Sequence, residues 1–483
     1  MPTSPSAALP LPPDMAPLAP SGNPFVTGPF GPVAGESTSH ALQTQGQIPP
    51  ELDGLYVRIG PNPIHLRKPD QHHWFSGDGM VHGVRLQGGE ARWYRSRYVE
   101  SRQASARLGR PIVPGETRRN FIDTVNTNVF AHAGRIWATV EAGPAPVQLD
   151  GQLKSIHRGL FDSPTRHPFS AHPHLDPLTG ELHAICYDAI QHRALTYVRV
   201  NAQGQVDKTE AIPVKHGPMV HDCAITRTRV VVLDLPLTFS WWALLKGEKL
   251  PYHWNRRHQP RIGLLPREGS ARDMRWFDIE PCFVFHPSNA YDLPDGSVVM
   301  DVCVHPFMFD KARPDADLHA RFERWTMPAH GTRVVREVLH DAAQEFPRLD
   351  ERKVGQPYRW AYTVGFDITP YGGQQLYKHD LSALSGAANN SGSGKLGTQA
   401  HVFGPQRKPG EFVFVPRGPE EDEGWLIGFV ANLETDRGEL HVLDARDVTA
   451  PAVAIVTLPS RVPMGFHGNW VDASAVRGDL PLS

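Results

Sequence analysis

The stretch ELHAICYDAIQHRALTYVRVNAQGQ, residues 181–205, decides the fold class. It contains two runs rich in β-branched, aromatic and other apolar residues, ELHAICYDAI (181–190) and ALTYVRV (194–200), and polar or glycine-containing turn residues follow each run. Short apolar runs that are bounded by turn residues are typical of β-strands paired in hairpins. We therefore predict a β-hairpin at this point of the chain.

The same pattern recurs along most of the chain. Further runs are RIWATV (135–140), RVVVLDL (229–235), SVVMDVCV (297–304) and WLIGFVANL (425–433). Amphipathic helices are few, and the best candidates lie near 236–248 and around 311–325. A chain with many short strands and little helix is expected to be all-β.

A large closed β-assembly fits this distribution of strands. A propeller of seven blades would use roughly 60 residues per blade, enough for four strands and their loops. A pair of β-sandwiches is the alternative, because no repeated Trp-Asp dipeptide marks the blades. The Gly/Ser/Asn-rich segment 381–400 is predicted to be a flexible surface loop.

Composition excludes several classes of protein. The chain has 483 residues, 49 Lys and Arg against 51 Asp and Glu, and 40% hydrophobic residues. This charge balance argues against a strongly basic nucleic-acid-binding protein, and the apolar content argues against a mostly disordered chain. The sequence contains no run of 18 apolar residues, so we predict no membrane-spanning helix.

The N-terminal sequence indicates where the folded domain begins, and the cysteines indicate the cellular compartment. Residues 1–24 are rich in proline and are predicted to form a disordered arm rather than a signal peptide, and residues 25–483 are predicted to be a single β-propeller domain. The four cysteines form no Cys-x-x-Cys pair, so we do not expect a cysteine zinc site, and a cytoplasmic location fits their use.

Four of the 25 histidines stand out because each follows or interrupts an apolar run. They are His172, His221, His286 and His467, at separations of 49, 65 and 181 residues. Imidazole ligates iron, zinc, copper and nickel, and inner strands of different blades would bring distant residues to one axis. The alternative is that they are structural or surface histidines, as most of the 25 must be.

Three glutamates have contexts that suit a hydrogen bond to such histidines. They are Glu141 after RIWATV, Glu345 in QEFPRLD and Glu411 at the start of EFVFVP. A metal-bound histidine usually donates its other ring N–H to a carboxylate or carbonyl group. The alternative for each is a solvent-facing glutamate at the end of a strand.

These segments resemble the carotenoid cleavage oxygenases, a family of iron-dependent enzymes, over residues 45–472. Ten blocks occur in the family's order: IPPELDGLYVRIGPNP (48–63), WFSGDGMVHGV (74–84), NTNVFAHAGRIWATVEAGP (126–144), FSAHPHLDPLTGEL (169–182), MVHDCAIT (219–226), CFVFHPSNAYD (282–292), EFPRLDER (345–352), GEFVFVPR (410–417), EDEGWLIGFV (421–430) and RVPMGFHGNWV (461–471). The resemblance implies a seven-bladed β-propeller with a helical and loop cap over the metal-bearing face.

The resemblance also implies the site. Fe(II) would be held by His172, His221, His286 and His467, the three glutamates would hydrogen-bond the ligand histidines, and Thr127 would lie near the vacant side of the metal. His167 and His305 have no counterpart among the family's ligands and are interpreted as structural or surface groups. The implied reaction uses O2 to cleave a carbon–carbon double bond into two carbonyl products. No Gly-rich dinucleotide motif indicates a nicotinamide or flavin.

The family's substrates include carotenoids, apocarotenoids and phenolic stilbenes or phenylpropanoids. In stilbene cleavers a lysine precedes the glutamate that corresponds to Glu141 and anchors the phenol together with a tyrosine. Here that residue is Val140, and Tyr98 is the candidate for the tyrosine. Because valine cannot pair with a phenol oxygen, we predict a hydrophobic polyene, with stilbene cleavage as the alternative.

Other classes of function remain as alternatives. A retinoid isomerase would use the same iron site, a non-enzymatic carotenoid carrier would not need four intact ligands with their carboxylates, and a calcium-dependent propeller hydrolase would need carboxylates on the axis. The segment 236–254, PLTFSWWALLKGEKLPYHW, combines aromatic residues with lysines and is a candidate for peripheral contact with the inner face of a membrane. Its tryptophans could instead cap the propeller core.

Overall fold

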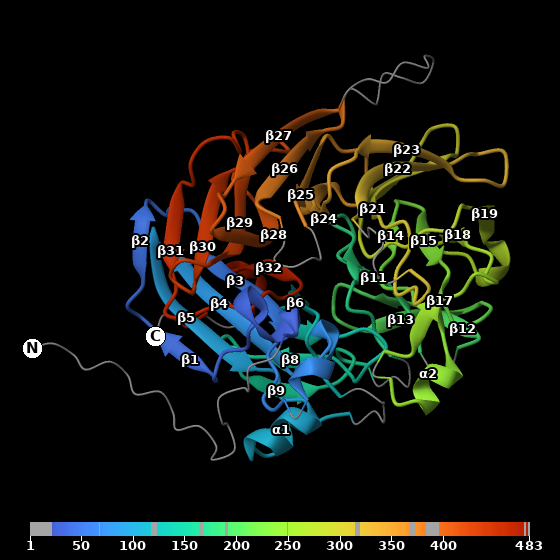
Figure 1. The fold of residues 1–483 in the computed structure, drawn as a ribbon. Helices are drawn as coiled ribbons and strands as arrows, with labels where there is room; N and C mark the ends of the chain where they lie inside the picture. Colours follow the sequence, from blue (N-terminus) through green and yellow to red (C-terminus); the bar gives the residue numbers. More distant parts are fainter. Residues whose placement is uncertain are drawn as a thin grey trace, which may run out of the picture.

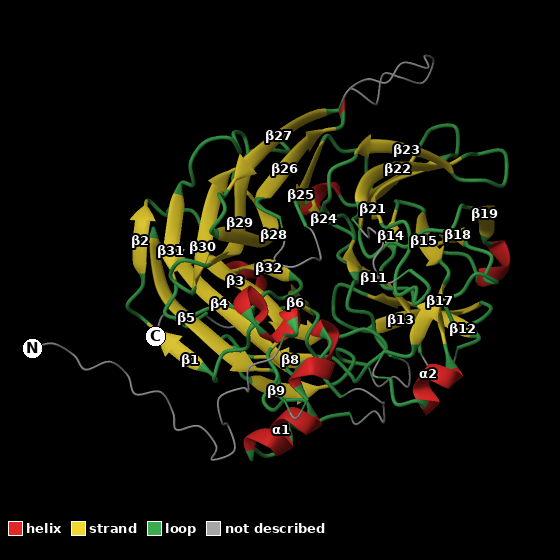
Figure 2. Ribbon diagram, in the orientation of Figure 1, coloured by secondary structure: helices red, strands yellow, loops and turns green. Residues whose placement is uncertain are grey.

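Seven β-sheets surround one axis as the blades of a propeller, which confirms the predicted fold class (Figures 1 and 2). The structure is a computed structural model that describes residues 22–481, except 67, 117–122, 164–167, 189–191, 249, 314–318, 367–372, 383–395 and 478–479. Nearly all of the predicted N-terminal arm, most of the predicted loop 381–400 and His167 lie outside the described residues.

Five blades consist of four antiparallel strands each, named here from the axis outward. They are β6 (Asn128–His132), β7 (Arg135–Thr139), β8 (Val147–Leu149) and β9 (Ser155–Arg158); β10 (His174–Leu175), β11 (Leu182–Cys186), β12 (Ala194–Val200) and β13 (Val206–Pro213); β14 (Ala224–Ile225), β15 (Arg229–Asp234), β18 (Arg261–Pro266) and β19 (Arg275–Asp278); β20 (Pro287–Asp292), β21 (Val298–Val304), β22 (Arg321–Met327) and β23 (Val335–His340); and β24 (Glu345–Arg348), β25 (Trp360–Val364), β26 (Gln375–Asp380) and β27 (Gly397–Val402). The hairpin predicted from residues 181–205 is present as β11 and β12.

Two further blades are built from both ends of the chain, and they close the ring. One contains β32 (Gly468–Asp472), β3 (Gly54–Pro61), β4 (Gly79–Gln87), β5 (Glu90–Tyr98) and β1 (Ser37–Ser39). The other contains β28 (Arg407–Pro416), β29 (Gly424–Asn432), β30 (Arg437–Asp444), β31 (Ala454–Thr457) and β2 (Gln43–Gly46). The C-terminal strand β32 thus pairs with β3, and the N-terminal strand β2 pairs with β31.

The innermost strands contact one another around the axis. β32 packs beside β6 and β28, and β20 packs beside β14 and β24. Figure 1 shows β6, β24, β28 and β32 around the centre of the ring. The start of each inner strand therefore lies close to the starts of its neighbours, although the strands are far apart in sequence.

Two short α-helices lie outside the blades. α1 (Arg102–Leu108) begins at Ser101, whose side chain accepts a hydrogen bond from the Ala104 N–H. α2 (Trp241–Leu245) separates the strands β16 (Leu237–Phe239) and β17 (Tyr252–Trp254), so it occupies only part of the helix predicted near 236–248. None of the described helices is long and apolar enough to cross a membrane.

The helix predicted around 311–325 is absent from the described part of this segment, which leaves out residues 314–318. Residues Arg321–Met327 form β22, which pairs with β21 on one side and β23 on the other. Phe322 and Trp325 are three residues apart, as on one face of a helix, but both are buried within the sheet. Strand pairing on both sides therefore determines the structure of this segment, and local periodicity does not.

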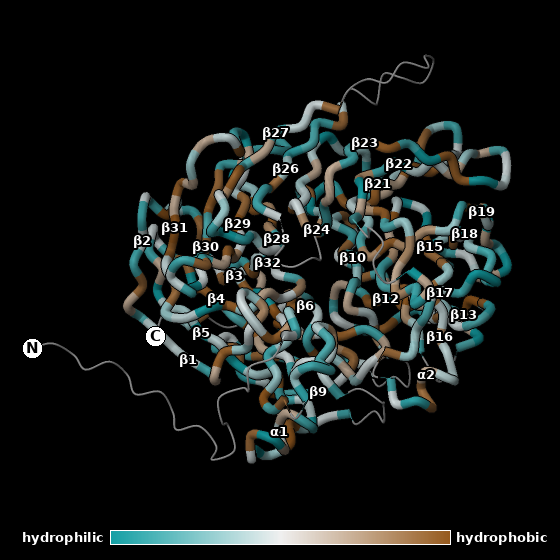
Figure 3. The backbone as a smooth tube through the Cα atoms, viewed as in Figure 1, coloured by the Kyte–Doolittle hydropathy of each residue, from teal (hydrophilic) through white to brown (hydrophobic). Residues whose placement is uncertain are grey.

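The apolar residues of the strands pack between neighbouring blades. All nine residues of β29 are buried, and the hydrophobic segments in Figure 3 follow the strands around the ring. Because each sheet is covered on both faces, many strands are apolar along their whole length rather than alternating.

Replacement of Ile427 by alanine is expected to destabilise the protein by about 2–5 kcal/mol, because this fully buried side chain on β29 would leave a cavity. The matched control is Val335→Ala on β23, where the side chain is 61% exposed and the change should stay within about 0.5 kcal/mol. Urea unfolding followed by circular dichroism measures both values. Equal losses in the two variants would contradict this account of the core.

Candidate metal centre

The four predicted histidines lie at the axial ends of four inner strands. His286 and His467 directly precede β20 and β32, while His172 and His221 lie two and three residues before β10 and β14. All four side chains are buried. The strands of four different blades thus bring together residues of which the first and last, His172 and His467, are 295 positions apart in sequence.

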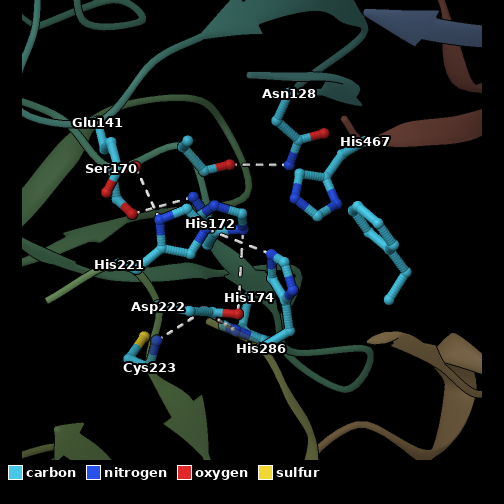
Figure 4. Close-up of polar contacts among 12 residues, drawn as sticks. Asn128, Glu141, Ser170, His172, His174, His221, Asp222, Cys223, His286 and His467 are labelled. Carbon is cyan, nitrogen blue, oxygen red and sulfur yellow. Dashed lines mark hydrogen bonds and ion pairs between the residues drawn. The ribbon is translucent and has the colours of Figure 1, made fainter. Parts of the chain in front are cut away.

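The ring nitrogens of these histidines converge on one point, as Figure 4 shows. One nitrogen from each of His172, His221, His286 and His467 lies within 4.8 Å of the others. His221 Nε2 and His286 Nε2 lie 3.3 Å apart. Four imidazoles in this arrangement could hold a metal ion.

Each of three histidines contacts one of the three predicted glutamates through Nδ1. The distances are 2.7 Å from His221 to Glu141 Oε1, 2.6 Å from His286 to Glu345 Oε2 and 3.0 Å from His467 to Glu411 Oε1. A carboxylate accepts the proton of Nδ1–H, so Nε2 of a neutral ring keeps its lone pair. In their neutral form, these three rings would therefore present Nε2 lone pairs to the centre.

His172 is held differently. Its Nδ1 lies 3.9 Å from Asp222 Oδ2, which is too long for a hydrogen bond, and Asp222 Oδ1 lies 2.8 Å from His174 Nε2. Its Nε2 is buried and has no hydrogen-bond partner among the described residues. Burial and the three neighbouring histidines place the pKa of His172 well below its ordinary value.

These donors fit a divalent transition metal. Two ring nitrogens 3.3 Å apart repel unless a proton or a metal cation lies between them, and a buried nitrogen without a partner, such as His172 Nε2, is costly. Metal–nitrogen bonds of about 2.1 Å hold adjacent ligand nitrogens about 3 Å apart. Neutral imidazole suits iron, zinc, copper and nickel better than calcium or magnesium.

More than one donor stabilises the charged forms of Glu345 and Glu411. Burial would raise the pKa of Glu345, but His286 and His305 leave it well below its usual range. Burial likewise opposes ionisation of Glu411, but His467 and Arg348 lower its pKa to about 2. These carboxyl groups remain carboxylates at neutral pH.

Three residues that sequence analysis did not assign to the site contact these carboxylates. The Tyr187 hydroxyl donates to Glu141 Oε2 over 2.9 Å, and Arg348 Nη1 lies 3.4 Å from Glu411 Oε1. His305 Nε2 lies 3.2 Å from Glu345 Oε1, so His305 is a buried neighbour of the centre rather than a surface group. No motif assigned these contacts to the three residues, although Arg348 lies in the block EFPRLDER, and only the fold reveals them.

Thr127 lies at the start of β6, where its carbonyl accepts a hydrogen bond from the His467 N–H over 3.1 Å. Its hydroxyl donates to Asn126 Oδ1 over 3.1 Å. The side chain lines the same cavity as His467. Thr127 is therefore held beside His467 in the cavity wall.

A cavity of about 520 Å³ extends from the histidines to α1 and α2. Its wall is mainly aromatic and aliphatic, and the large apolar and aromatic side chains in it are Trp74, Phe75, Val140, Tyr187, Met219, Leu244, Leu250, Tyr252, Phe285, Phe346, Phe366 and Phe466. Polar groups lie at the end beside α1, namely Gln103, Arg107 and Asp123. The cavity suits a long apolar molecule.

The two residues used to judge the substrate class have different positions. Val140 lines the cavity next to Glu141, as expected. Tyr98 does not reach the cavity: it packs with Ile64, Met80 and Ala104, and its hydroxyl oxygen accepts a hydrogen bond from Asn62 Nδ2 over 2.7 Å. The interpretation of Tyr98 as a phenol-binding tyrosine is therefore wrong, because its side chain points into the packing beneath α1.

The fold and site define a β-propeller whose axial histidines form a metal centre at an apolar cavity. The family model described as retinal pigment epithelial membrane protein matches residues 30–472. A carotenoid cleavage oxygenase of Mycobacterium tuberculosis is 38% identical over 94% of this chain and 99% of its own length.

Two solved structures of related oxygenases have a fold similar to that of this chain. A lignostilbene dioxygenase from Pseudomonas brassicacearum has a TM-score of 0.81 and 27% identity, covering 94% of this chain and 100% of its own. A Synechocystis apocarotenoid oxygenase has a TM-score of 0.77 and 25% identity, covering 91% and 97%. The chain belongs to the carotenoid oxygenase family, whose members depend on iron.

Replacement of Glu411 by glutamine is expected to weaken Fe(II) binding about 10–100-fold, because the amide accepts the His467 proton less strongly than a carboxylate does. Glu439→Gln is a matched control, since Glu439 Oε2 contacts His441 Nε2 at 2.7 Å in a buried pair on β30, outside the site. Competition with a chromogenic chelator measures the affinity. A loss of the same size in both variants would contradict a specific role of Glu411.

Proposed function

We propose that this protein is an Fe(II)-dependent dioxygenase that cleaves a carbon–carbon double bond of a carotenoid or apocarotenoid into two carbonyl products. The observation that carries the proposal is the convergence of four buried imidazoles at an apolar, aromatic-walled cavity. In this proposal the iron ligands are His172, His221, His286 and His467. When bound, the iron would supply the redox chemistry that makes O2 reactive toward the alkene.

The protein's own residues supply ligand orientation. Glu141, Glu345 and Glu411 keep the proton on Nδ1 and fix the planes of the three rings that line the cavity. Thr127 is held by Asn126 beside His467, so its methyl and hydroxyl groups limit the space on that side of the centre. The glutamates position the ligand rings, and Thr127 restricts the space beside the centre. We assign no proton transfer to these groups.

The cavity wall supplies substrate orientation and exclusion of water. Phe75, Phe285 and Phe466 surround the space beside the histidines, and such rings pack well against a flat polyene. Water is excluded from an apolar cavity that a hydrophobic substrate fills, which protects reactive species from side reactions. Positioning a double bond near the centre is then the main catalytic task of the protein.

Val140 favours the polyene over a phenolic stilbene. It presents only methyl groups at the position where the family's stilbene cleavers have lysine, and the neighbouring Tyr187 hydroxyl already donates to Glu141. A phenol placed there would lose its hydrogen bonds to water, at a cost of roughly 1–3 kcal/mol. The similarity to the lignostilbene dioxygenase keeps stilbene cleavage as the second candidate.

Fe(II)-loaded protein in air is expected to convert a carotenoid or apocarotenal into shorter apocarotenoid aldehydes or ketones. Mass spectrometry identifies the products, and their masses locate the cleaved bond. The same incubation contains a hydroxystilbene as the competing substrate, and protein without metal is the control. Phenolic benzaldehydes as the main products would overturn the proposed substrate class in favour of stilbene cleavage.

The proposal includes contact with a membrane surface, where polyenes dissolve. On α2, Trp241, Trp242 and Leu245 are 52%, 76% and 77% exposed, and Lys246 follows at the end of the helix. The next residues of this segment, Gly247, Glu248 and Leu250, line the cavity. An apolar surface next to the cavity would let a substrate pass from lipid to the site.

The double variant Trp242→Glu/Leu245→Glu is expected to lower binding to liposomes at least about tenfold, since two exposed apolar side chains would no longer enter the lipid. Val335→Glu/Val338→Glu is the control, because these residues of β23 are 61% and 48% exposed away from the cavity. Co-sedimentation with liposomes measures binding. Equal binding of both variants and the unmodified protein would remove membrane contact from the proposal.

A further inference from the structure

His305 occupies a position that the proposed iron chemistry does not use. Its side chain is 6% exposed and lines the cavity. Two backbone hydrogen bonds fix it opposite Phe283, with the His305 N–H donating over 2.8 Å and its carbonyl accepting over 2.9 Å. The ring also packs edge to face against Phe285, with centroids 5.3 Å apart. The orientation of this imidazole is therefore defined by its surroundings.

Glu345 lies between two imidazoles. Its Oε2 accepts from His286 Nδ1 over 2.6 Å and from the Phe346 N–H over 2.6 Å, while its Oε1 faces His305 Nε2 at 3.2 Å. A carboxylate accepts only, so the proton in the last contact belongs to His305. His305 thus fixes the second oxygen of the carboxylate that orients His286.

The other two glutamates have second donors of different kinds. Glu141 Oε2 accepts from the Tyr187 hydroxyl, and Glu411 Oε2 accepts from the Gly468 N–H. Each of the three carboxylates therefore uses one oxygen for a cluster histidine and the other for a separate donor. For Glu345 alone among them, that separate donor is a histidine side chain in the cavity wall.

We propose that His305 is a positioning residue of the metal centre, which acts through Glu345 to hold the ring of His286. The proposal rests on the proposed iron-dependent function and extends it. Without the His305 donor, Glu345 Oε1 would face an apolar cavity with an unsatisfied charge, and the carboxylate would rotate toward another donor. His286 would then lose its fixed direction toward the metal.

The test compares His305→Phe with His305→Gln. Phenylalanine preserves the packing against Phe285 but removes the donor, whereas glutamine can place an amide N–H near the position of Nε2. We expect His305→Phe to weaken Fe(II) binding about tenfold. This is the lower limit of the loss usually seen when a group that orients a metal ligand is removed. We expect His305→Gln to retain most of the affinity. Chelator competition without substrate or O2 measures this affinity.

A spectrum and two reference variants separate this role from general loss of structure. The visible absorption of the Co(II)-loaded protein should shift in His305→Phe and return toward the original spectrum in His305→Gln. The control His82→Phe removes another buried histidine, whose Nδ1 contacts the Tyr94 hydroxyl at 2.8 Å, and should leave affinity and spectrum unchanged. In a Glu345→Gln background, His305→Phe should have little further effect on metal affinity. Both changes weaken the same series of contacts, from His305 through residue 345 to His286.

The outcomes distinguish this proposal from the one on which it rests. Unmodified protein that binds neither Fe(II) nor Co(II) would overturn both. Normal binding and an unchanged spectrum in His305→Phe would overturn the role of His305 alone, as would an equal loss in His305→Phe and His305→Gln when both remain folded. If His305→Phe does not fold, an unimpaired His305→Ala would overturn the role, and a loss that His305→Gln restores would support it.

Discussion

Closure of the ring is the constraint on which the site depends. β32 from one end of the chain completes the blade of β3, and β2 from the other end completes the blade of β31, so the chain ends cannot separate from these two blades without breaking strand pairs. The closed ring fixes the distance from each inner strand to the axis. Each inner strand then supplies one side chain to the centre or its surroundings: Thr127, His172, His221, His286, Glu345, Glu411 and His467. A backbone irregularity adjusts two of these positions, since the register shifts beside Glu345 in β24 and around Glu411 in β28.

Charge balance explains why the carboxylates can be buried there. An isolated carboxylate in an apolar interior is costly, and a paired one is tolerated only when its remaining lone pairs are also satisfied. Glu141, Glu345 and Glu411 each meet this condition with an imidazole and a second donor. A divalent cation among the four imidazoles would offset most of the three negative charges. The same groups that orient the ligands thus make a cation at the axis electrostatically favourable.

The sequence predicts the parts of this arrangement that leave a local mark. His286 and His467 follow apolar runs directly, and the family blocks place all four histidines in order, so the blades, the cluster and its glutamates could be anticipated. The remainder depends on contacts between distant strands. His305 and Tyr187 have no motif, because a buried donor is defined only by the acceptor that the fold brings to it. Tyr98 was misassigned for the same reason, and β22 was misread because the spacing of Phe322 and Trp325 also suits a helix.

The four histidines are held in two ways, and the difference follows from where the cavity lies. His221, His286 and His467 line the cavity, so one side of each ring lacks permanent packing, and a hydrogen bond to a glutamate replaces it. His172 is outside the described cavity lining and is enclosed by the other three rings, with centroid distances of 4.3, 5.2 and 4.6 Å. Packing alone can fix such a ring, and its 3.9 Å distance from Asp222 shows that no strong hydrogen bond is needed. Glutamate partners therefore hold the three rings that line the cavity, and close packing holds His172. This arrangement leaves the cavity open beside the histidines without loosening them.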